Sequence, residues 1–347
     1  MKNNLYKITI FSLILIFLSS PIFSQRKINY TFSNVSKSDI KWWNNLDEQW
    51  QFIFNRKVGF GTEVTHEKLM ELFSKTEIAI IGKNITHLKP ITRFKNLEIF
   101  YCSGNLISDL SPLSKLTKLK KIEAARNQIK SLKPLKKLKD LEFLNISDNK
   151  IKSLSPLSKN EKLNTLLAQD NQIETLKGLE NKFQLERVTL QNNKFTSLNP
   201  LKNCKKINNL HLDGNLISDI SGLSKFTKLE QLYLSRTSVK SISALENLIN
   251  LKILSILDSP IQSLHGVEKM SKLQDLYCQE TMIQDLEPLR NLKSLQKIVF
   301  NKTVISSLAP LEKMENLYLL FNNTKISFDE IEQFKITHPN STLLTTF

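Results

Sequence analysis

Apolar residues recur along most of this chain in a single pattern that repeats every 22 residues. One copy of the pattern contains Leu141, Leu144, Ile146, Asn149, Ile151, Leu154 and Leu157. Its asparagine belongs to a column formed by Asn105, Asn127, Asn149, Asn171, Asn193 and Asn215, which continues as Thr237, Ser259, Thr281 and Thr303. A fixed period of this length predicts a stack of similar units in which each unit contacts its neighbours.

Each repeat predicts one short strand and one 3₁₀ turn. The alternation around Leu144 and Ile146 has the two-residue period of a strand, so the residues between the apolar positions face outward. After the asparagine, apolar residues recur at every third position, which suits a 3₁₀ turn. Seven of the ten prolines stand seven residues after the asparagine column, where a fixed φ and a missing N–H suit the start of a turn. Stacking therefore gives a parallel sheet on one side, the turns on the other side and a leucine core between them.

This pattern resembles the leucine-rich repeat family, and specifically the 22-residue class of bacterial internalins and eukaryotic phosphatase regulators. The similarity covers residues 77–326 in eleven consecutive units. The first unit departs from the pattern with Lys83 in the asparagine column, and the last unit is one residue short. The resemblance implies an α/β leucine-rich repeat solenoid, with a curved parallel sheet on the concave face, 3₁₀ segments on the convex face and helical caps. It also implies protein recognition on the concave face.

The N-terminus predicts a leader peptide. Lys2 and Lys7 precede an apolar run, and small and polar residues follow it, so residues 1–24 are interpreted as a secretory signal peptide cut near Ser24. No later apolar stretch is long enough to span a membrane. We therefore expect a secreted protein, periplasmic or extracellular, with no integral membrane segment after the signal is removed.

The segments that flank the repeats are predicted as caps. Residues 25–76 contain all three tryptophans, and one face of a predicted helix there contains Trp43, Leu46, Trp50, Ile53 and Phe54. A second short helix is predicted from Thr65 to Phe73. We expect this segment to cover the open end of the first repeat, the alternative being an aromatic ligand site. Residues 327–347 predict a helix that begins with a capping box at Ser327 and Glu330, followed by a last strand.

The candidate catalytic groups are His211, Asp213 and Ser235, which are predicted to lie close together on the outer sheet face. A catalytic triad needs a buried, oriented base and an oxyanion hole, and an open sheet offers neither. The five histidines include no pair with metal-ligand spacing, and the three cysteines are interpreted as small buried hydrophobes. We therefore expect no catalytic residue, no metal and no cofactor, and an enzyme such as a hydrolase is the disfavoured alternative.

The chain has 347 residues and a formal net charge of +16, and this charge is distributed unevenly. The outward sheet positions of ten repeats sum to −1, whereas the eleven 3₁₀-side segments sum to +14, of which the first four segments carry +10. This excess is interpreted as solubility charge, or alternatively as contact with an anionic envelope, matrix or polysaccharide surface. No nucleic-acid partner is expected, because a secreted protein seldom meets nucleic acid.

The outward sheet positions also contain aromatic and apolar residues that the core does not need. Those predicted to point outward are Tyr101, Phe143, Tyr233, Tyr277 and Phe321, with Ile253, Leu257, Val299 and Leu319 around the last of them. An apolar cluster over neighbouring repeats predicts a contact patch, and aromatic residues commonly anchor protein interfaces. The predicted partner-binding residues are Tyr233, Tyr277, Leu257, Ile253, Val299, Phe321, His211 and Asp213. The sequence thus predicts a secreted, non-enzymatic protein-binding module, unless a C-terminal cap or self-association covers the patch.

Overall fold

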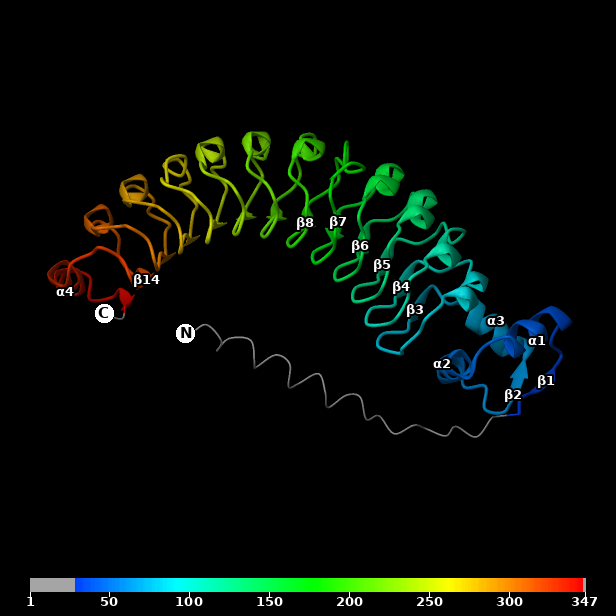
Figure 1. The fold of residues 1–347 in the computed structure, drawn as a ribbon. Coiled ribbons are helices and arrows are strands. Elements are labelled where there is room, and N and C mark those ends of the chain that lie inside the picture. Colours follow the sequence, from blue (N-terminus) through cyan, green and yellow to red (C-terminus); the bar gives the residue numbers. More distant parts are fainter. Residues whose placement is uncertain (1–28, 346–347) are drawn as a thin grey trace, which may run out of the picture. The chain divides into compact units, whose positions relative to one another are not determined.

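The computed structural model describes residues 29–345 and divides the chain into two compact units, the first ending at Leu72 and the second beginning at Phe73. The predicted signal peptide, residues 1–24, lies outside the described residues. Figure 1 shows the helices of the first unit and the long stack of strands of the second unit. Each unit has its own core, and each is described here by itself.

The first unit contains two parallel strands and three helices. These are β1 (Thr31–Ser33), α1 (Lys37–Asn44), α2 (Glu48–Val58), β2 (Glu63–Thr65) and α3 (His66–Ser74), and β1 pairs with β2. The prediction of a single helix with this aromatic face is wrong, because Asp47 divides the segment into two helices. The Asp47 carboxylate accepts a hydrogen bond from the Trp50 N–H at 2.9 Å and so begins a new helix.

The predicted apolar face of this unit is nevertheless buried. Trp43 and Trp50 are fully buried, and their rings meet those of Phe60 and Phe54 at centroid distances of 4.6 and 5.1 Å. These large rings share the core of the unit with the aliphatic side chains of Leu46, Ile53, Val64, Leu69 and Leu72.

The second unit is a parallel sheet whose strands follow one another in chain order. The strands are β3 (Glu77–Ala79), β4 (Ile99–Tyr101), β5 (Lys121–Glu123), β6 (Phe143–Asn145), β7 (Thr165–Leu167), β8 (Arg187–Thr189), β9 (Asn209–His211), β10 (Gln231–Tyr233), β11 (Ile253–Ser255), β12 (Asp275–Tyr277), β13 (Lys297–Val299), β14 (Tyr318–Leu320) and β15 (Thr342–Leu344). Together they form a 13-stranded sheet. Each strand from β3 to β13 pairs at a 22-residue offset, as Leu144 does with Leu166. This confirms the predicted leucine-rich repeat solenoid.

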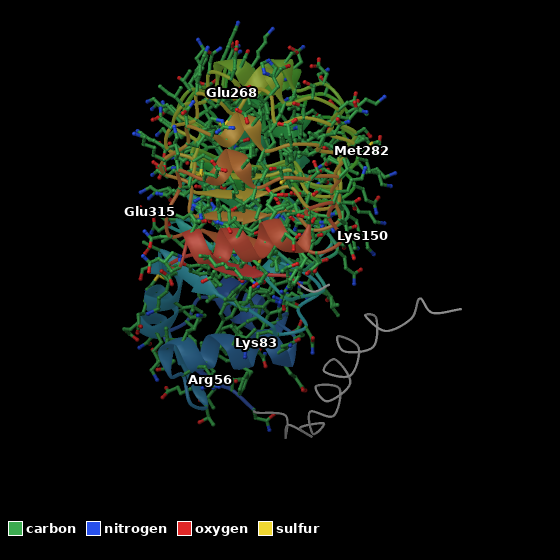
Figure 2. The ribbon with its side chains drawn as sticks, turned by 90° about the vertical axis from the view of Figure 1, so that its left-hand side faces the viewer. Arg56, Lys83, Lys150, Glu268, Met282 and Glu315 are labelled. Carbon is green, nitrogen blue, oxygen red and sulfur yellow. The ribbon has the colours of Figure 1, made fainter. Side chains whose placement is uncertain are left out.

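3₁₀ turns lie opposite the strands. They span Lys89–Arg93, Ser111–Leu113, Lys133–Lys137, Ser155–Lys159, Asn199–Leu201, Ser221–Lys225, Ser243–Leu245, Glu287–Leu289 and Ala309–Leu311. In the second unit of Figure 1 the strands follow the inner side of the curve and the turns follow its outer side. Figure 2 shows the two flanks between them, and Lys150 and Met282, which occupy the same position of two repeats, lie on the same flank.

Two repeats depart from the prediction of one 3₁₀ turn per repeat. At Gly178 and Gly266 the described chain forms a plain turn instead, with φ angles of +104° and +112°. In each repeat the glycine N–H donates to a glutamate two residues later, to Glu180 at 2.6 Å and to Glu268 at 2.7 Å. The carboxylate therefore accepts an N–H that proline lacks at the same position of most other repeats. Gly222 occupies the equivalent position of another repeat and keeps the 3₁₀ turn.

The asparagine column forms the predicted ladder between repeats. The Asn149 amide donates to the carbonyl oxygens of Ala124, Ile146 and Ser147 at 3.0–3.1 Å. Its Oδ1 accepts from the Ile129 N–H of the preceding repeat at 2.9 Å. These hydrogen bonds reach backbone groups of two repeats, so one side chain ties the two repeats together.

A second buried column becomes polar over three successive repeats. At a position that other repeats fill with leucine, phenylalanine or methionine stand Asn160, Lys182 and Cys204. Each donates to a backbone carbonyl of a preceding repeat: Asn160 Nδ2 to Leu138 at 2.7 Å, Lys182 Nζ to Ser158 at 2.9 Å and Cys204 Sγ to Leu179 at 3.3 Å. Burial lowers the pKa of the Lys182 ammonium, because the charged form loses its hydration.

The last repeat corrects one predicted orientation. Phe321 and Leu319, expected to point outward, are both fully buried, and the Phe321 ring stacks on Phe300 with centroids 4.9 Å apart. Strand β14 pairs with β13 at a 21-residue offset, because the last repeat lacks one residue. Shifting a strand by one residue exchanges its two faces. Phe321 therefore belongs to the core, and it is no longer a candidate for partner contact.

The chain then closes with a helix and a strand. Helix α4 (Phe328–Thr337) begins at Ser327, whose hydroxyl accepts from the Glu330 N–H at 3.2 Å, and β15 adds to the sheet beside β14. No helix within residues 29–345 is long and apolar enough to cross a membrane.

Candidate functional site

A hollow of about 400 Å³ opens on the sheet face between β9 and β12. It is lined by Asp213, Tyr233, Ser235, Arg236, Ser255, Leu257 and Tyr277. We call these seven residues the tyrosine hollow. The sheet register explains its shape, because Tyr233, Ser255 and Tyr277 occupy the same position of three neighbouring strands. Because Ser255 is small and its two neighbours in the column are tyrosines, a space remains between the two rings. This space is the hollow.

Four of the predicted partner-binding residues come together here. Tyr233, Tyr277, Leu257 and Asp213 all line the hollow. Ser255 and Arg236 also line the hollow, although neither is among the residues predicted to contact a partner. The signal that could have found Ser255 is a small residue flanked by tyrosines at 22-residue spacing in one column.

The other predicted residues lie outside the hollow. Ile253 is half-buried on β11, on the same face as the tyrosines. Val299 is beside Tyr277 in the register, but only 5% of its surface is exposed, so it offers almost no contact area. Phe321 faces the core.

His211 borders the hollow by stacking on Tyr233. Their ring centroids are 4.1 Å apart with an interplanar angle of 24°. Burial and the nearby Arg187 cation lower the pKa of His211 to about 4, since both disfavour a second positive charge. The imidazole is therefore neutral at neutral pH, and its half-buried ring extends the apolar wall that Tyr233 begins.

Asp213 is held by the backbone of the next repeat. Its Oδ1 accepts the Ser235 N–H at 3.0 Å, while burial raises the pKa of the carboxyl. The Ser235 hydroxyl bonds instead to the Ser255 hydroxyl at 2.7 Å. The His211 Nε2 has no hydrogen-bond partner among the described residues, and Asp213 binds the backbone rather than the hydroxyl of Ser235, so the three residues do not make the hydrogen-bonded relay that a triad requires.

Lysines cover the tyrosine and phenylalanine rings at two places on the sheet face. Lys297 Nζ lies 5.2 Å from the ring centre of Tyr277 and 5.3 Å from that of Tyr318. At the other end of the sheet Lys121 Nζ lies between the rings of Tyr101 and Phe143, at 5.0 and 4.7 Å, and pairs with Glu123 at 2.8 Å. Cation–π contacts at such partly exposed sites favour these ring orientations by about 0.5–1 kcal/mol.

We expect His211 to make the fold sensitive to mild acid. Its pKa of about 4 in the folded protein lies below the ordinary 6.5, so the unfolded chain binds the proton first as the pH falls. The free energy of unfolding should therefore decrease from about pH 6.5 to pH 4 and level off below that. Relative to His211→Gln, which cannot titrate there, the wild type should lose about 1–3 kcal/mol over this window.

Denaturant titrations of both proteins between pH 7 and pH 4 measure this difference. The raised pKa of Asp213 acts in the opposite direction, but it is present in both proteins and cancels in the comparison. Parallel curves for the two proteins would contradict the burial of a neutral His211.

Metal binding and cysteine redox chemistry both require suitable side chains that lie close together. Residues 29–345 contain no group of three or more histidine, cysteine, aspartate or glutamate side chains that could hold a metal ion. The three cysteines are separate and buried, and burial raises the pKa of each thiol.

Comparison with known proteins gives a consistent result. A sequence model of two leucine-rich repeats matches residues 95–137. The structure of an internalin from Listeria monocytogenes superposes with a TM-score of 0.80 at 25% identity, covering 87% of this chain and 91% of the internalin. A leucine-rich repeat protein from Leptospira interrogans gives a TM-score of 0.71 at 19% identity, covering 80% and 86% of the two chains.

A plant peptide hormone receptor, solved in complex with the hormone RGF2, gives a TM-score of 0.57 at 18% identity, covering 77% of this chain and 53% of the receptor. No curated protein sequence matches the chain at a significant level. Taken together, these similarities are to proteins with stacked leucine-rich repeats.

Proposed function

Because the chain is an internalin-like leucine-rich repeat protein, we propose that it is a secreted, non-enzymatic module that binds a protein partner on its concave face, at the tyrosine hollow. The observation that carries the proposal is the hollow itself: two tyrosines two repeats apart, with Ser255 between them and Leu257 beside them. An isolated exposed apolar residue would mean little, whereas these residues share one concave site.

The chemistry of the hollow suits a protein side chain. The tyrosine rings and Leu257 form an apolar middle, and Asp213 and Arg236 supply charged groups at its border. Protein interfaces combine an apolar centre with a polar rim. Tyrosines are frequent anchors there, because they bury a large area while losing few side-chain rotamers.

Neighbouring side chains restrain both tyrosine rings of the hollow. Tyr233 is held by the His211 stack, and the ring of Tyr277 is covered by Lys297. A partner would meet side chains that already have their bound orientation, so little conformational entropy is lost on binding. The hollow alone is smaller than a stable interface, so the partner would also contact neighbouring repeats of the concave face.

Secretion is part of the proposal. It is supported by the basic and apolar N-terminal segment and by the likeness to an internalin. A binding role is further supported by the absence, within the described residues, of a metal cluster and of a hydrogen-bonded triad at His211, Asp213 and Ser235.

Alanine substitution in the hollow tests the proposed site. The partner is first captured with the wild-type mature protein and identified, and its affinity is then measured by titration calorimetry. Tyr233→Ala and Tyr277→Ala should each weaken binding by about 1–3 kcal/mol and leave the melting temperature close to that of the wild type.

Tyr101→Ala is the matched control, because Tyr101 occupies the same column of the sheet several repeats away. It should bind the partner with unchanged affinity. Equal losses for all three variants, or no loss at Tyr233 and Tyr277, would refute the assignment of the site to the hollow.

A further inference from the structure

Four successive repeats place a cation at the same position on the outer side of the solenoid. These residues are Arg93, Lys115, Lys137 and Lys159, and we call them the cation row. They stand at or just after the end of a 3₁₀ turn, as Lys137 and Lys159 do. In later repeats the same position holds asparagine or an isolated lysine, namely Asn181, Asn203, Lys225, Asn247, Lys269, Asn291 and Lys313.

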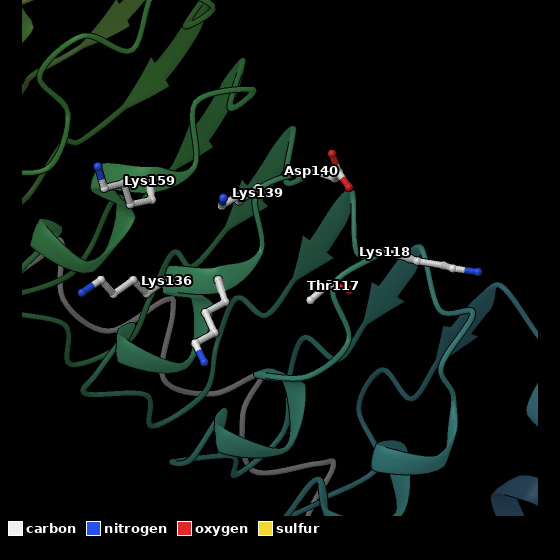
Figure 3. Close-up of a pocket in the computed structure, with 7 residues that line it drawn as sticks. Thr117, Lys118, Lys136, Lys139, Asp140 and Lys159 are labelled. Carbon is white, nitrogen blue, oxygen red and sulfur yellow. The ribbon is translucent and has the colours of Figure 1, made fainter.

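A groove runs beside the cation row. It has a volume of about 690 Å³ and is lined by Thr117, Lys118, Lys136, Lys137, Lys139, Asp140 and Lys159. In Figure 3 these side chains come from neighbouring repeats, at the turns and at the segments that lead into the strands. The groove therefore crosses from one repeat to the next rather than lying within a single repeat.

Within the described residues, the lysines that line this groove form no ion pair. Its one carboxylate, Asp140, is engaged by Lys162 at 2.7 Å. Lys115, Lys137 and Lys159 form no ion pair with any carboxylate of the described residues. The lysines of the adjoining flank behave differently, since Lys120 and Lys252 pair with the glutamates of the preceding repeats at 2.7 and 2.8 Å.

We infer that the cation row and its groove bind a linear acidic polysaccharide. Cations of one column repeat once per stacked repeat, about 5 Å apart at the sheet and further apart on the outer side of the curve. Such a row matches a polymer that carries an anionic group on successive sugar units. The like charges of Lys115, Lys137 and Lys159 also repel one another, and a polyanion relieves this repulsion.

The surroundings of the row favour a polysaccharide over other anionic surfaces. Between Leu106 and Phe183, which are themselves exposed, no large hydrophobic side chain is exposed, although many lysines are. Single-stranded nucleic acids are usually held by stacking on exposed aromatic rings, and peripheral membrane segments insert apolar side chains. A groove lined by lysines accommodates a narrow chain better than it does a flat bilayer.

Charge neutralisation at three positions tests the inference. A fluorescent heparin decasaccharide serves as the probe, and its affinity for the mature protein is measured by anisotropy at several salt concentrations. The triple variant Lys115→Gln, Lys137→Gln and Lys159→Gln should bind at least about tenfold more weakly near physiological salt. The slope of log affinity against log salt should decrease by roughly two to three, because three fewer ionic contacts release fewer counterions.

The matched control removes the same charge from the same column elsewhere. It is the triple variant Lys225→Gln, Lys269→Gln and Lys313→Gln, whose lysines do not occupy successive repeats. It should keep most of the wild-type affinity, and both triple variants should melt like the wild type, because only exposed side chains change.

Two outcomes would overturn the inference. One is an equal loss of heparin binding in both triple variants, which would mean that net charge alone is responsible. The other is that vesicles of phosphatidylcholine and phosphatidylglycerol, or a ten-nucleotide oligothymidine, bind the wild type at least as tightly as the decasaccharide at equal salt. Loss of heparin binding with unchanged partner binding at the tyrosine hollow would separate this surface from the proposed function.

Discussion

Replacing Gly178 with alanine is expected to destabilise the solenoid by about 3–5 kcal/mol, which is at the upper end of single-residue effects. Two causes act together. The φ angle of +104° is one that residues with a side chain rarely adopt, and a Cβ atom there would collide with the carbonyl group of Leu154 and lie 2.7 Å from the Cα of Ser155. Both contacts are to backbone of the preceding repeat, so relief requires the two repeats to move apart.

Gly222 provides the control for this prediction, because it occupies the equivalent position of another repeat. Its φ angle is not positive, and a Cβ atom there would meet nothing within 4 Å. Gly222→Ala should therefore be neutral or stabilise by up to about 1 kcal/mol, since alanine restricts the unfolded chain. Guanidinium unfolding midpoints compare the two variants, and similar midpoints would show that the close approach at Gly178 is unimportant.

Asn149→Ala is expected to cost about 2–4 kcal/mol, because it removes four hydrogen bonds from the ladder and leaves the buried Ile129 N–H without a partner. The side chain donates to three carbonyl oxygens and accepts the buried N–H of Ile129. Alanine replaces none of these bonds, and Asn149 is buried, so water replaces them poorly.

Ser259→Ala should cost less, about 1 kcal/mol, although Ser259 occupies the same column. Its hydroxyl forms only long hydrogen bonds, at 3.3 Å to the carbonyl oxygens of Leu234 and Leu257 and at 3.4 Å from the Thr237 N–H. Unfolding in denaturant measures both costs, and the loss of stability should be larger for Asn149→Ala than for Ser259→Ala. A loss at Ser259 as large as that at Asn149 would contradict the ladder described here.

The repeat made most of the fold predictable from the sequence. A 22-residue period fixes which side chains face the core, because each strand pairs with the next at that offset. The alternation around Leu144 and the ladder at Asn149 therefore follow from local spacing alone. The same logic brought Tyr233 and Tyr277 into one column, and the structure places them one on each side of Ser255.

The departures arise where the repeat itself is broken. The missing residue in the last repeat reversed the expected face of Phe321, because the register there is set by pairing with β13 rather than by counting from the previous repeat. In the turn at Gly178, the Glu180 carboxylate accepts a hydrogen bond from the glycine N–H. The spacing of the repeat does not predict this contact. Asp47 divided a predicted helix because an aspartate can cap a new helix as well as lie within an old one.

The shape of the tyrosine hollow could not be predicted from the pattern alone. Whether an outward residue is accessible depends on the sizes of its neighbours in the adjoining strands. Val299 and Tyr277 occupy the same column, yet Val299 is nearly buried while Tyr277 lines the hollow. Such differences depend on packing between repeats that periodicity does not describe.

The most direct measurement of the central claim is partner binding after the hollow has been blocked chemically. The three native cysteines are buried and their raised pKa values make them unreactive, so an introduced surface cysteine can be labelled selectively. Leu257→Cys carries a bulky maleimide into the hollow, and Ala125→Cys carries the same group to the same column at the other end of the sheet. The account predicts that labelling at 257 abolishes partner binding and labelling at 125 leaves it intact. Full binding after labelling at 257 would contradict it.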